Sequence, residues 1–177
     1  MKLIIVLVVV VLLVFWCISI YNNLVKLRNN RENAFANIDV QLKQRHDLVP
    51  QIVATVKGYA DHEKEVFMRV TEARSAAMGA TTIDDKINAE NVLTSALSGF
   101  KVSMEAYPEL KANENFKELQ AQLEGTENRI SVERRKFNET AREYNTSIRR
   151  FPKNIVASMF GFEKRPYFEA EEGSEKA

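Results

Sequence analysis

The strongest constraint on this chain is an apolar run near its N-terminus. Residues 3–20 read LIIVLVVVVLLVFWCISI, eighteen residues without a charged side chain. A helix rises roughly 1.5 Å per residue, so this run can cross most of a hydrocarbon core of about 30 Å. We therefore predict a transmembrane anchor over residues 1–21. The residues assigned to it are Leu3, Val8, Leu13, Phe15, Trp16, Ile20 and Tyr21.

A cleavable signal peptide is the alternative interpretation of the same run, because it also starts with a basic residue and an apolar stretch. Its apolar core usually spans about 7–15 residues and precedes an A-x-A-like cleavage site. Here the run is longer, and the nearest small residues, Cys17 and Ser19, lie inside it. An uncleaved anchor fits the sequence better.

The charges that flank the run predict its orientation. Lys26, Arg28 and Arg31 follow it, whereas Lys2 precedes it. The positive-inside rule then favours an external N-terminus and a cytoplasmic body. A periplasmic or extracellular body remains the alternative, because Lys2 lies close to the membrane.

Composition excludes several classes of protein. The anchor leaves about 155 residues, enough for one domain with a core. The chain has 25 Lys and Arg against 24 Asp and Glu, so no excess positive charge favours nucleic acid as a partner. Cys17 is the only cysteine, which excludes intramolecular disulfides and cysteine metal clusters.

The apolar residues beyond the anchor recur at helical spacing. Steps of three, four or seven run from Leu24 to Ala77, with Pro50 as the only interruption. Few turn residues surround Pro50, so we predict one long helix kinked there. The alternative is a new helix that Asp47 caps, with Pro50 in its first turn.

Three further helices follow in the predicted order. Thr82 caps a helix that ends before Pro108, and Asn113 caps the longest pattern, over residues 114–150. Phe151-Pro152 closes that helix, and a short amphipathic helix ends at Gly161.

The predicted fold is therefore all-α. An N-terminal transmembrane helix leads into an elongated antiparallel bundle of three long helices plus a short C-terminal helix; the alternative is a four-helix up-and-down bundle. The bundle domain covers residues 22–162, and residues 163–177 form an acidic, flexible tail.

Several short motifs together cover nearly the whole chain. They are YNNLV (21–25), NIDVQLK (37–43), RHDLVP (45–50), TVKGYA (55–60), EAYPELKAN (105–113), TENRI (126–130), YN (144–145) and GF (161–162). These motifs closely resemble those of the LemA family. Phe35 stands where the family has Trp. The resemblance implies a bacterial single-pass protein of the inner (plasma) membrane, with a helical-bundle body and no established catalysis.

Motifs for catalysis are missing from the sequence. His62-Glu63 begins like a zinc-protease helix, but Val66 occupies the place of the second histidine. The ordinary interpretation of His46 and His62 is exposed helix histidines. The sequence also lacks a nucleophile elbow and a glycine-rich phosphate loop. We therefore predict no catalytic residue, no metal, no cofactor and no enzyme.

A dense polar run suggests an interface between helices. Its candidate residues are Asp39, Gln41, Arg45 and Asp47, facing Glu127, Arg129, Arg134 and Arg135 on the last long helix, of the same protomer or another. Such an interface would fix the register of the helices. The alternative is a set of solvent-exposed pairs at four-residue spacing, each worth a few tenths of a kcal/mol.

The short C-terminal helix combines basic and apolar residues. They are Arg149, Arg150, Lys153, Ile155, Val156, Met159 and Phe160. This arrangement is typical of a helix that lies at an anionic membrane surface. Packing of the same face onto the bundle is the alternative.

These features favour a membrane-anchored structural or scaffold protein. Its partners would be the lipid bilayer, further copies of the chain and another membrane protein, without nucleic acid. Long helices tethered in one membrane could assemble laterally and organise or shape the membrane. The alternative is an adaptor or regulatory subunit of a membrane protease or signalling complex.

Overall fold

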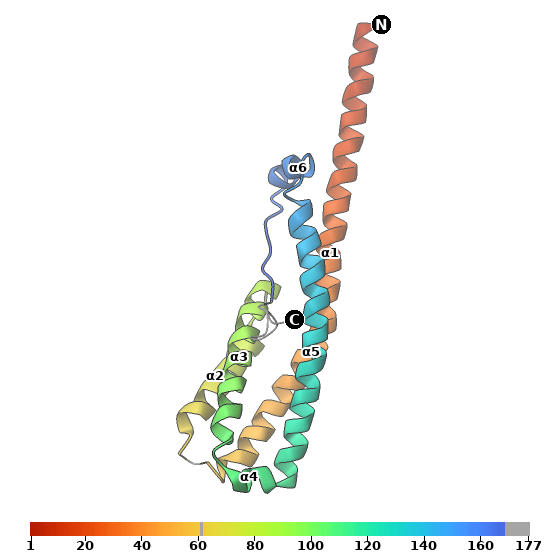
Figure 1. Ribbon diagram of the computed structural model, residues 1–177. Helices are drawn as coiled ribbons and strands as arrows, with labels where there is room; N and C mark the ends of the chain where they lie inside the picture. The colour runs from red at the N-terminus through yellow and green to blue at the C-terminus, as the bar shows by residue number, and fades with distance from the viewer. Residues whose placement is uncertain (61, 169–177) are drawn as a thin grey trace.

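Residues 1–60 and 62–168, which the computed structural model describes, form six α-helices and no strand (Figure 1). The helices are α1 (Lys2–Lys57), α2 (Lys64–Gly79), α3 (Ile83–Met104), α4 (Pro108–Ala112), α5 (Glu114–Ser147) and α6 (Lys153–Met159). The all-α prediction is confirmed.

The bundle is an elongated rod built from two helix pairs. The two longest helices, α1 and α5, pack along each other, and α2 packs on α3 (Figure 1). The short helix α4 turns the chain from α3 into α5 at the end of the rod farthest from the N-terminus. From there α5 runs back along α1 and brings α6 into contact with it.

The first part of α1 projects beyond the bundle. It is long and apolar enough to cross a membrane by length and composition, and almost none of that stretch is buried against the rest of the chain. The same helix continues without a break into the bundle, where Leu24, Ile38 and Ile52 are buried. One rigid element therefore joins the apolar segment to the body.

The first reversal of the chain differs from the prediction. The first helix ends at Lys57 instead of continuing to Ala77, and the chain turns back between Lys57 and Lys64. Gly58, which the sequence pattern placed inside a helix, is the C-cap of α1. With this extra reversal the body has four long helices, as in the up-and-down alternative.

Pro50 lies inside α1 and does not interrupt it. Proline has no N–H to donate to the carbonyl four residues earlier, which here belongs to His46. Arg74 of α2 supplies the missing donor, with Nε 2.6 Å from the His46 oxygen. The neighbouring helix therefore satisfies the group that Pro50 leaves free.

The predicted helix starts after the reversal are confirmed at two caps. Thr82 Oγ1 accepts a hydrogen bond from the Asp85 amide (3.1 Å), and Asn113 Oδ1 accepts one from the Phe116 amide (3.0 Å). Each side chain satisfies one of the amides that the first turn of a helix leaves free.

Apolar side chains form three clusters along the rod. The far cluster joins all four long helices and includes Ile52, Val70, Leu93 and Phe116. The middle cluster contains Phe35, Ile38, Ile87, Phe137 and Phe168. The near cluster joins Ile20, Leu24, Tyr144, Ile148 and Val156. Burial is therefore continuous from the end of the exposed apolar segment to α4.

Residues 163–168 correct the predicted flexible tail. They run back along α5 as an extended strap, and Phe168 at its end is only 2% exposed. Asn145 holds the strap through both backbone groups of Arg165 (2.8 and 2.9 Å), and Asn138 holds Phe168 in the same way (3.1 and 3.0 Å). The bundle therefore extends to Phe168, and residues 169–177 of the predicted tail lie outside the described residues.

Candidate functional site

The predicted anchor residues divide between the free part of α1 and the bundle. Those that project from the bundle are Leu3, Val8, Leu13, Phe15 and Trp16, all exposed. Ile20 is buried in the near cluster, and Tyr21 packs its ring 4.9 Å from that of Phe160. The free segment therefore ends close to residue 19, two residues before the predicted boundary.

The helix α6, which carries most of the predicted interfacial residues, packs beside α1 at this boundary (Figure 1). Val156 is buried in the near cluster, so part of the helix packs on the bundle. Ile155, Met159 and Phe160 are exposed instead. Lys153 Nζ lies 2.8 Å from Asn23 Oδ1 of α1, and Arg149 and Arg150 are exposed. α6 thus has one face on the bundle and one apolar face in solvent.

The centre of the predicted polar interface is Arg45, whose side chain is 0% exposed. Its guanidinium pairs with Glu90 of α3 and lies 2.8 Å from Glu127 Oε1 of α5. Its Nη1 also donates to Thr94 Oγ1 at 3.1 Å. One buried charge therefore connects α1, α3 and α5.

The polar cluster consists of Arg45, His46, Glu90, Thr94 and Glu127, and its charged groups stabilise one another. Burial alone would lower the pKa of Arg45, but the carboxylates of Glu127 and Glu90 outweigh it and raise that pKa. Burial would likewise raise the pKa of Glu90, but hydrogen bonding to His46 and the charge of Arg45 lower it. Both groups are therefore held in their charged forms.

The remaining predicted interface residues separate into paired and exposed ones. Arg129 donates from Nε to Gln41 Oε1 at 2.9 Å, which joins α5 to α1 within one chain. Asp39 pairs with Lys86 of α3 at 2.8 Å, and Arg134 donates to Thr94 at 3.1 Å. The side chains of Asp47 and Arg135 are exposed. Most of the predicted interface residues therefore have a partner on another helix, and several of these partners lie on α3.

His46 is not an exposed helix histidine. It is 9% exposed, and its Nε2 lies 2.7 Å from Glu90 Oε1. His62 is exposed, as expected. Within the described part of the chain, no three His, Cys, Asp or Glu side chains gather as metal ligands would.

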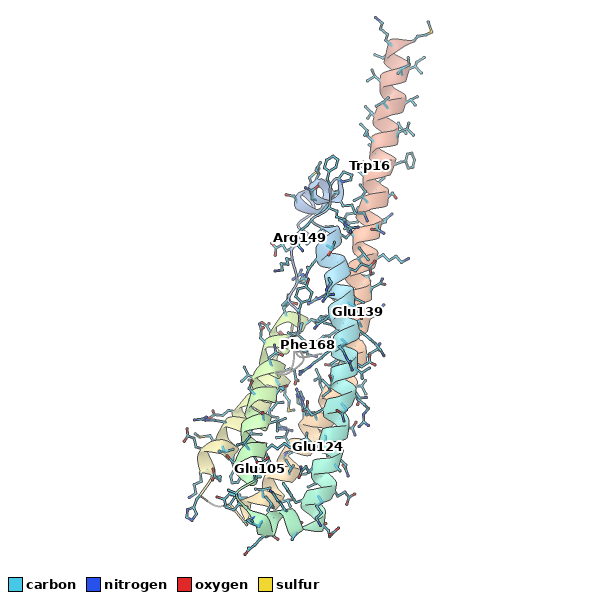
Figure 2. All side chains as sticks on the ribbon, in the orientation of Figure 1. Trp16, Glu105, Glu124, Glu139, Arg149 and Phe168 are labelled. Atoms are coloured by element: carbon cyan, nitrogen blue, oxygen red, sulfur yellow. The ribbon has the colours of Figure 1, made fainter. Side chains whose placement is uncertain are left out.

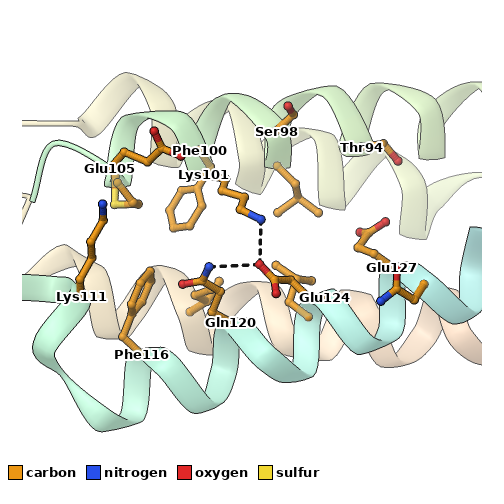
Figure 3. Close-up of a pocket in the computed structure, with 15 residues that line it drawn as sticks. Thr94, Ser98, Phe100, Lys101, Glu105, Lys111, Phe116, Gln120, Glu124 and Glu127 are labelled. Carbon is orange, nitrogen blue, oxygen red and sulfur yellow. Dashed lines mark hydrogen bonds and ion pairs between the residues drawn. The ribbon is translucent and has the colours of Figure 1, made fainter. Parts of the chain in front are cut away.

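An open groove of about 790 Å³ lies between α3 and α5 in the half of the rod near α4 (Figure 3). Phe100 and Phe116 line it from opposite sides, and Ile52 of α1 contributes to its lining. Lys101 Nζ and Glu124 Oε1 form an ion pair across it at 2.7 Å. Glu127 lines the groove and also pairs with Arg45, so the groove lies next to the polar cluster.

Comparison with known proteins decides the family. The sequence profile of the LemA family matches residues 34–177. The chain belongs to the LemA family. The matched region contains the whole polar cluster, α6 and the strap, whereas the free segment of α1 precedes it.

Curated relatives of this LemA-family chain are distant in sequence. Magnetosome protein MamQ of Magnetospirillum gryphiswaldense is 22% identical over 174 residues, covering 84% of this chain and 64% of MamQ. Protein LemA of Metamycoplasma hominis is 26% identical over 155 residues, covering 85% of this chain and 69% of that protein. The chain therefore spans just under two thirds of the length of MamQ.

The α3 side of the polar cluster was not predicted from the sequence. Glu90 and Thr94 lie between Ile87 and Leu97 at steps of three and four, which places them on the buried face of α3. A charged residue within an apolar stripe is a signal for a buried ionic partner, because such a charge is costly to bury alone. That signal was present in the sequence.

Proposed function

We propose that this LemA-family chain is a membrane-anchored, non-enzymatic scaffold that self-associates through its long helices. The observation that supports it most strongly is the continuity of α1. Its 56 residues would extend about 84 Å, and the exposed apolar segment and the body share this single helix. A bilayer around the free segment would hold the body in a defined direction.

Anchoring favours assembly by raising local concentration. Copies confined to one membrane meet at an effective concentration far above that in solution, so weak lateral contacts suffice. The α1–α5 pair offers a long lateral face. Val40 of α1 and Val132 of α5 are both exposed, and the Gln41–Arg129 hydrogen bond joins the two helices close to them in the sequence.

The character of the polar cluster supports a structural role. Arg45 and Glu90 are fully buried and pair with each other. Buried ionic groups of this kind can fix which register and which helices pair, although they add little net stability. In the proposed function they define the shape of one protomer, and neighbouring protomers meet through other surfaces.

The first test is extraction and sizing of the full-length protein. Alkaline carbonate should leave the chain in the membrane fraction, and native mass measurement in mild detergent should give a homomeric particle. Release by carbonate would contradict the anchor. A small one-to-one complex with a different protein would instead support the adaptor function.

A pair of variants locates the lateral contact. Val40→Lys together with Val132→Lys should lower the mass of the particle, because two charges would enter the proposed interface. Val102→Lys, at an exposed valine of α3, is the matched control and should leave the mass unchanged. An unchanged mass for the double variant would exclude this face from the contact.

A further inference from the structure

The short helix α6 leaves an unusual amount of apolar surface uncovered. Phe151 just before it is 81% exposed, and Ile155, Met159 and Phe160 are 52%, 72% and 56% exposed. Only Val156 and Ala157 of this segment are buried. A surface helix of a soluble bundle normally presents polar residues on its outer side, so clustered exposed apolar residues indicate a binding surface.

The position of α6 indicates what covers this surface. α6 contacts α1 where the free apolar segment ends, and Trp16 lies level with it (Figure 2). The Tyr21 ring lies 4.9 Å from that of Phe160 and 5.7 Å from that of Phe162. The apolar surface of α6 is thus continuous with the aromatic end of the segment that would cross the bilayer.

Basic residues surround the same surface. Arg149 and Arg150 precede α6, Lys164 follows it, and all three are exposed. Lys26 and Arg28 of α1 are also exposed, on either side of the near-cluster residue Leu27. Cations beside an apolar helix face at the membrane boundary suit a surface of anionic lipid headgroups.

We propose that α6 is a second membrane contact of this protein. Phe151, Ile155, Met159 and Phe160 enter the interfacial region of the bilayer that α1 crosses, and Arg149, Arg150 and Lys164 bind anionic headgroups. This rests on the proposed anchoring by α1. Because α6 is tethered at the boundary, modest lipid affinity is sufficient.

The second contact changes what the anchor can do. A single transmembrane helix leaves the body free to tilt against the membrane plane. A second contact beside it limits this tilt and fixes the height of the body above the bilayer. α6 therefore presents the lateral faces of identical copies at the same height and angle, as a lateral assembly requires.

Fluorescence quenching in the full-length protein tests this contact. Trp16 is the only tryptophan, so brominated lipids report on the anchor without any label. A Ser158→Cys variant in a Cys17→Ser background carries an environment-sensitive dye on exposed α6, and Val102→Cys carries the same dye on α3 near α4. Vesicles contain phosphatidylcholine with phosphatidylglycerol, and nitroxide lipids quench the dye.

The expected result is quenching of Trp16 and of the dye at position 158, with the dye at position 102 unaffected. Changing Phe151, Ile155 and Met159 to Ser should reduce quenching at position 158 to that at position 102. These side chains are exposed, so the bundle retains its core. Vesicles without phosphatidylglycerol should also give less quenching at position 158.

Two results would overturn the proposal in different ways. Quenching of Trp16 without quenching at position 158 would reject the α6 contact and leave the anchor intact. Absence of quenching at Trp16 would reject the anchor and the α6 contact together. Equal quenching at position 158 in both vesicle types would reject the role of the basic residues.

Discussion

Arg45 illustrates how a single residue organises this bundle. Its charge is removed from solvent and shared between Glu90 and Glu127, on two helices that pack little against each other directly. In the middle of the rod this connection holds α3 to the α1–α5 pair, together with Lys86–Asp39, Asp84–Arg31 and the packing of Ile87 in the middle cluster. The polar cluster is therefore part of the core.

Replacing Arg45 by Met should destabilise the fold by about 3–5 kcal/mol, because Glu90 would remain buried without its guanidinium partner. The measurement is denaturant unfolding of the full-length protein in detergent, followed by circular dichroism. Adding Glu90→Leu to Arg45→Met should recover part of the loss, since the buried charge is then removed. Lys101→Met breaks the exposed pair with Glu124 and should cost at most about 1 kcal/mol. Equal losses in Arg45→Met and Lys101→Met would refute the prediction.

The lowered pKa of Glu90 predicts how stability changes in acid. Burial opposes the shift, but His46 and Arg45 hold the folded-state pKa below the unfolded value of about 4.3. The unfolded state therefore binds more protons below that pH, and stability falls as pH falls through the folded-state pKa. Unfolding midpoints measured between about pH 6 and pH 2 should decline less steeply in Glu90→Gln than in the parent.

Glu124 provides the control for this pH profile. Its pKa is also lowered, chiefly by the hydrogen bond from Lys101, but its side chain is half exposed. Solvent screens that interaction, so Glu124→Gln should leave the acid profile close to the parent's. A parent-like profile in Glu90→Gln would contradict the assignment to Glu90.

Among the helices, α1 shows how tertiary contacts can preserve a helix that contains proline. The carbonyl of His46 lacks the amide that residue 50 would normally donate, and Arg74 of α2 donates to it instead. A buried or half-buried carbonyl without a donor costs about 1–3 kcal/mol. α2 therefore stabilises α1 at Pro50, where the helix lacks one of its own backbone hydrogen bonds.

A double-mutant cycle tests this compensation. Arg74→Leu should cost about 1–3 kcal/mol in unfolding free energy, because it removes the donor to His46. In a Pro50→Ala background the same change should cost about 1 kcal/mol less, since the new amide can donate to His46 within the helix. Purely additive effects would show that Arg74 acts elsewhere.

The sequence predicted those parts of the fold that obey local rules. Apolar spacing found the buried faces of the helices, and side-chain chemistry found the caps at Thr82 and Asn113. The reversal after Lys57 was missed because the apolar spacing continues in phase from Val56 to Val66. Gly58 was the only local sign of a break, and a lone glycine also occurs within helices.

The strap was missed for a different reason. Asn138 and Asn145 bind backbone groups that are 30 and 20 residues later in the sequence, and no local sequence pattern indicates such contacts. The acidic tail composition beyond Glu163 favoured disorder, yet Phe168 fills the middle cluster against Phe35 and Phe137. Of the candidate polar site, the α1 and α5 residues were found and the α3 residues were missed, because pairing across helices depends on the topology.

At the scale of the whole molecule, antiparallel packing returns basic residues to the membrane boundary. Lys26 and Arg28 are exposed on α1, and the antiparallel α5 leads to Arg149 (Figure 2), Arg150 and Lys153, whose Nζ lies 2.8 Å from Asn23 Oδ1 of α1. Positive residues next to a transmembrane helix are retained on the cytoplasmic side. Of these residues, Lys26 and Arg28 lie within the short flank that the rule counts, and from them we expect the body to be cytoplasmic.

Thiol labelling in intact cells tests this orientation. In a Cys17→Ser background, Val102→Cys places an exposed thiol in the body, far from the membrane boundary. A membrane-impermeant maleimide should label it only after the cells are permeabilised, and Glu139→Cys on α5 should behave in the same way. Replacing Lys26 and Arg28 by Gln should weaken the bias and expose part of the population to the reagent. Full labelling of Val102→Cys in intact parent cells would show that the body lies outside the cell membrane. Another part of the chain would then have to determine the orientation against the positive-inside rule.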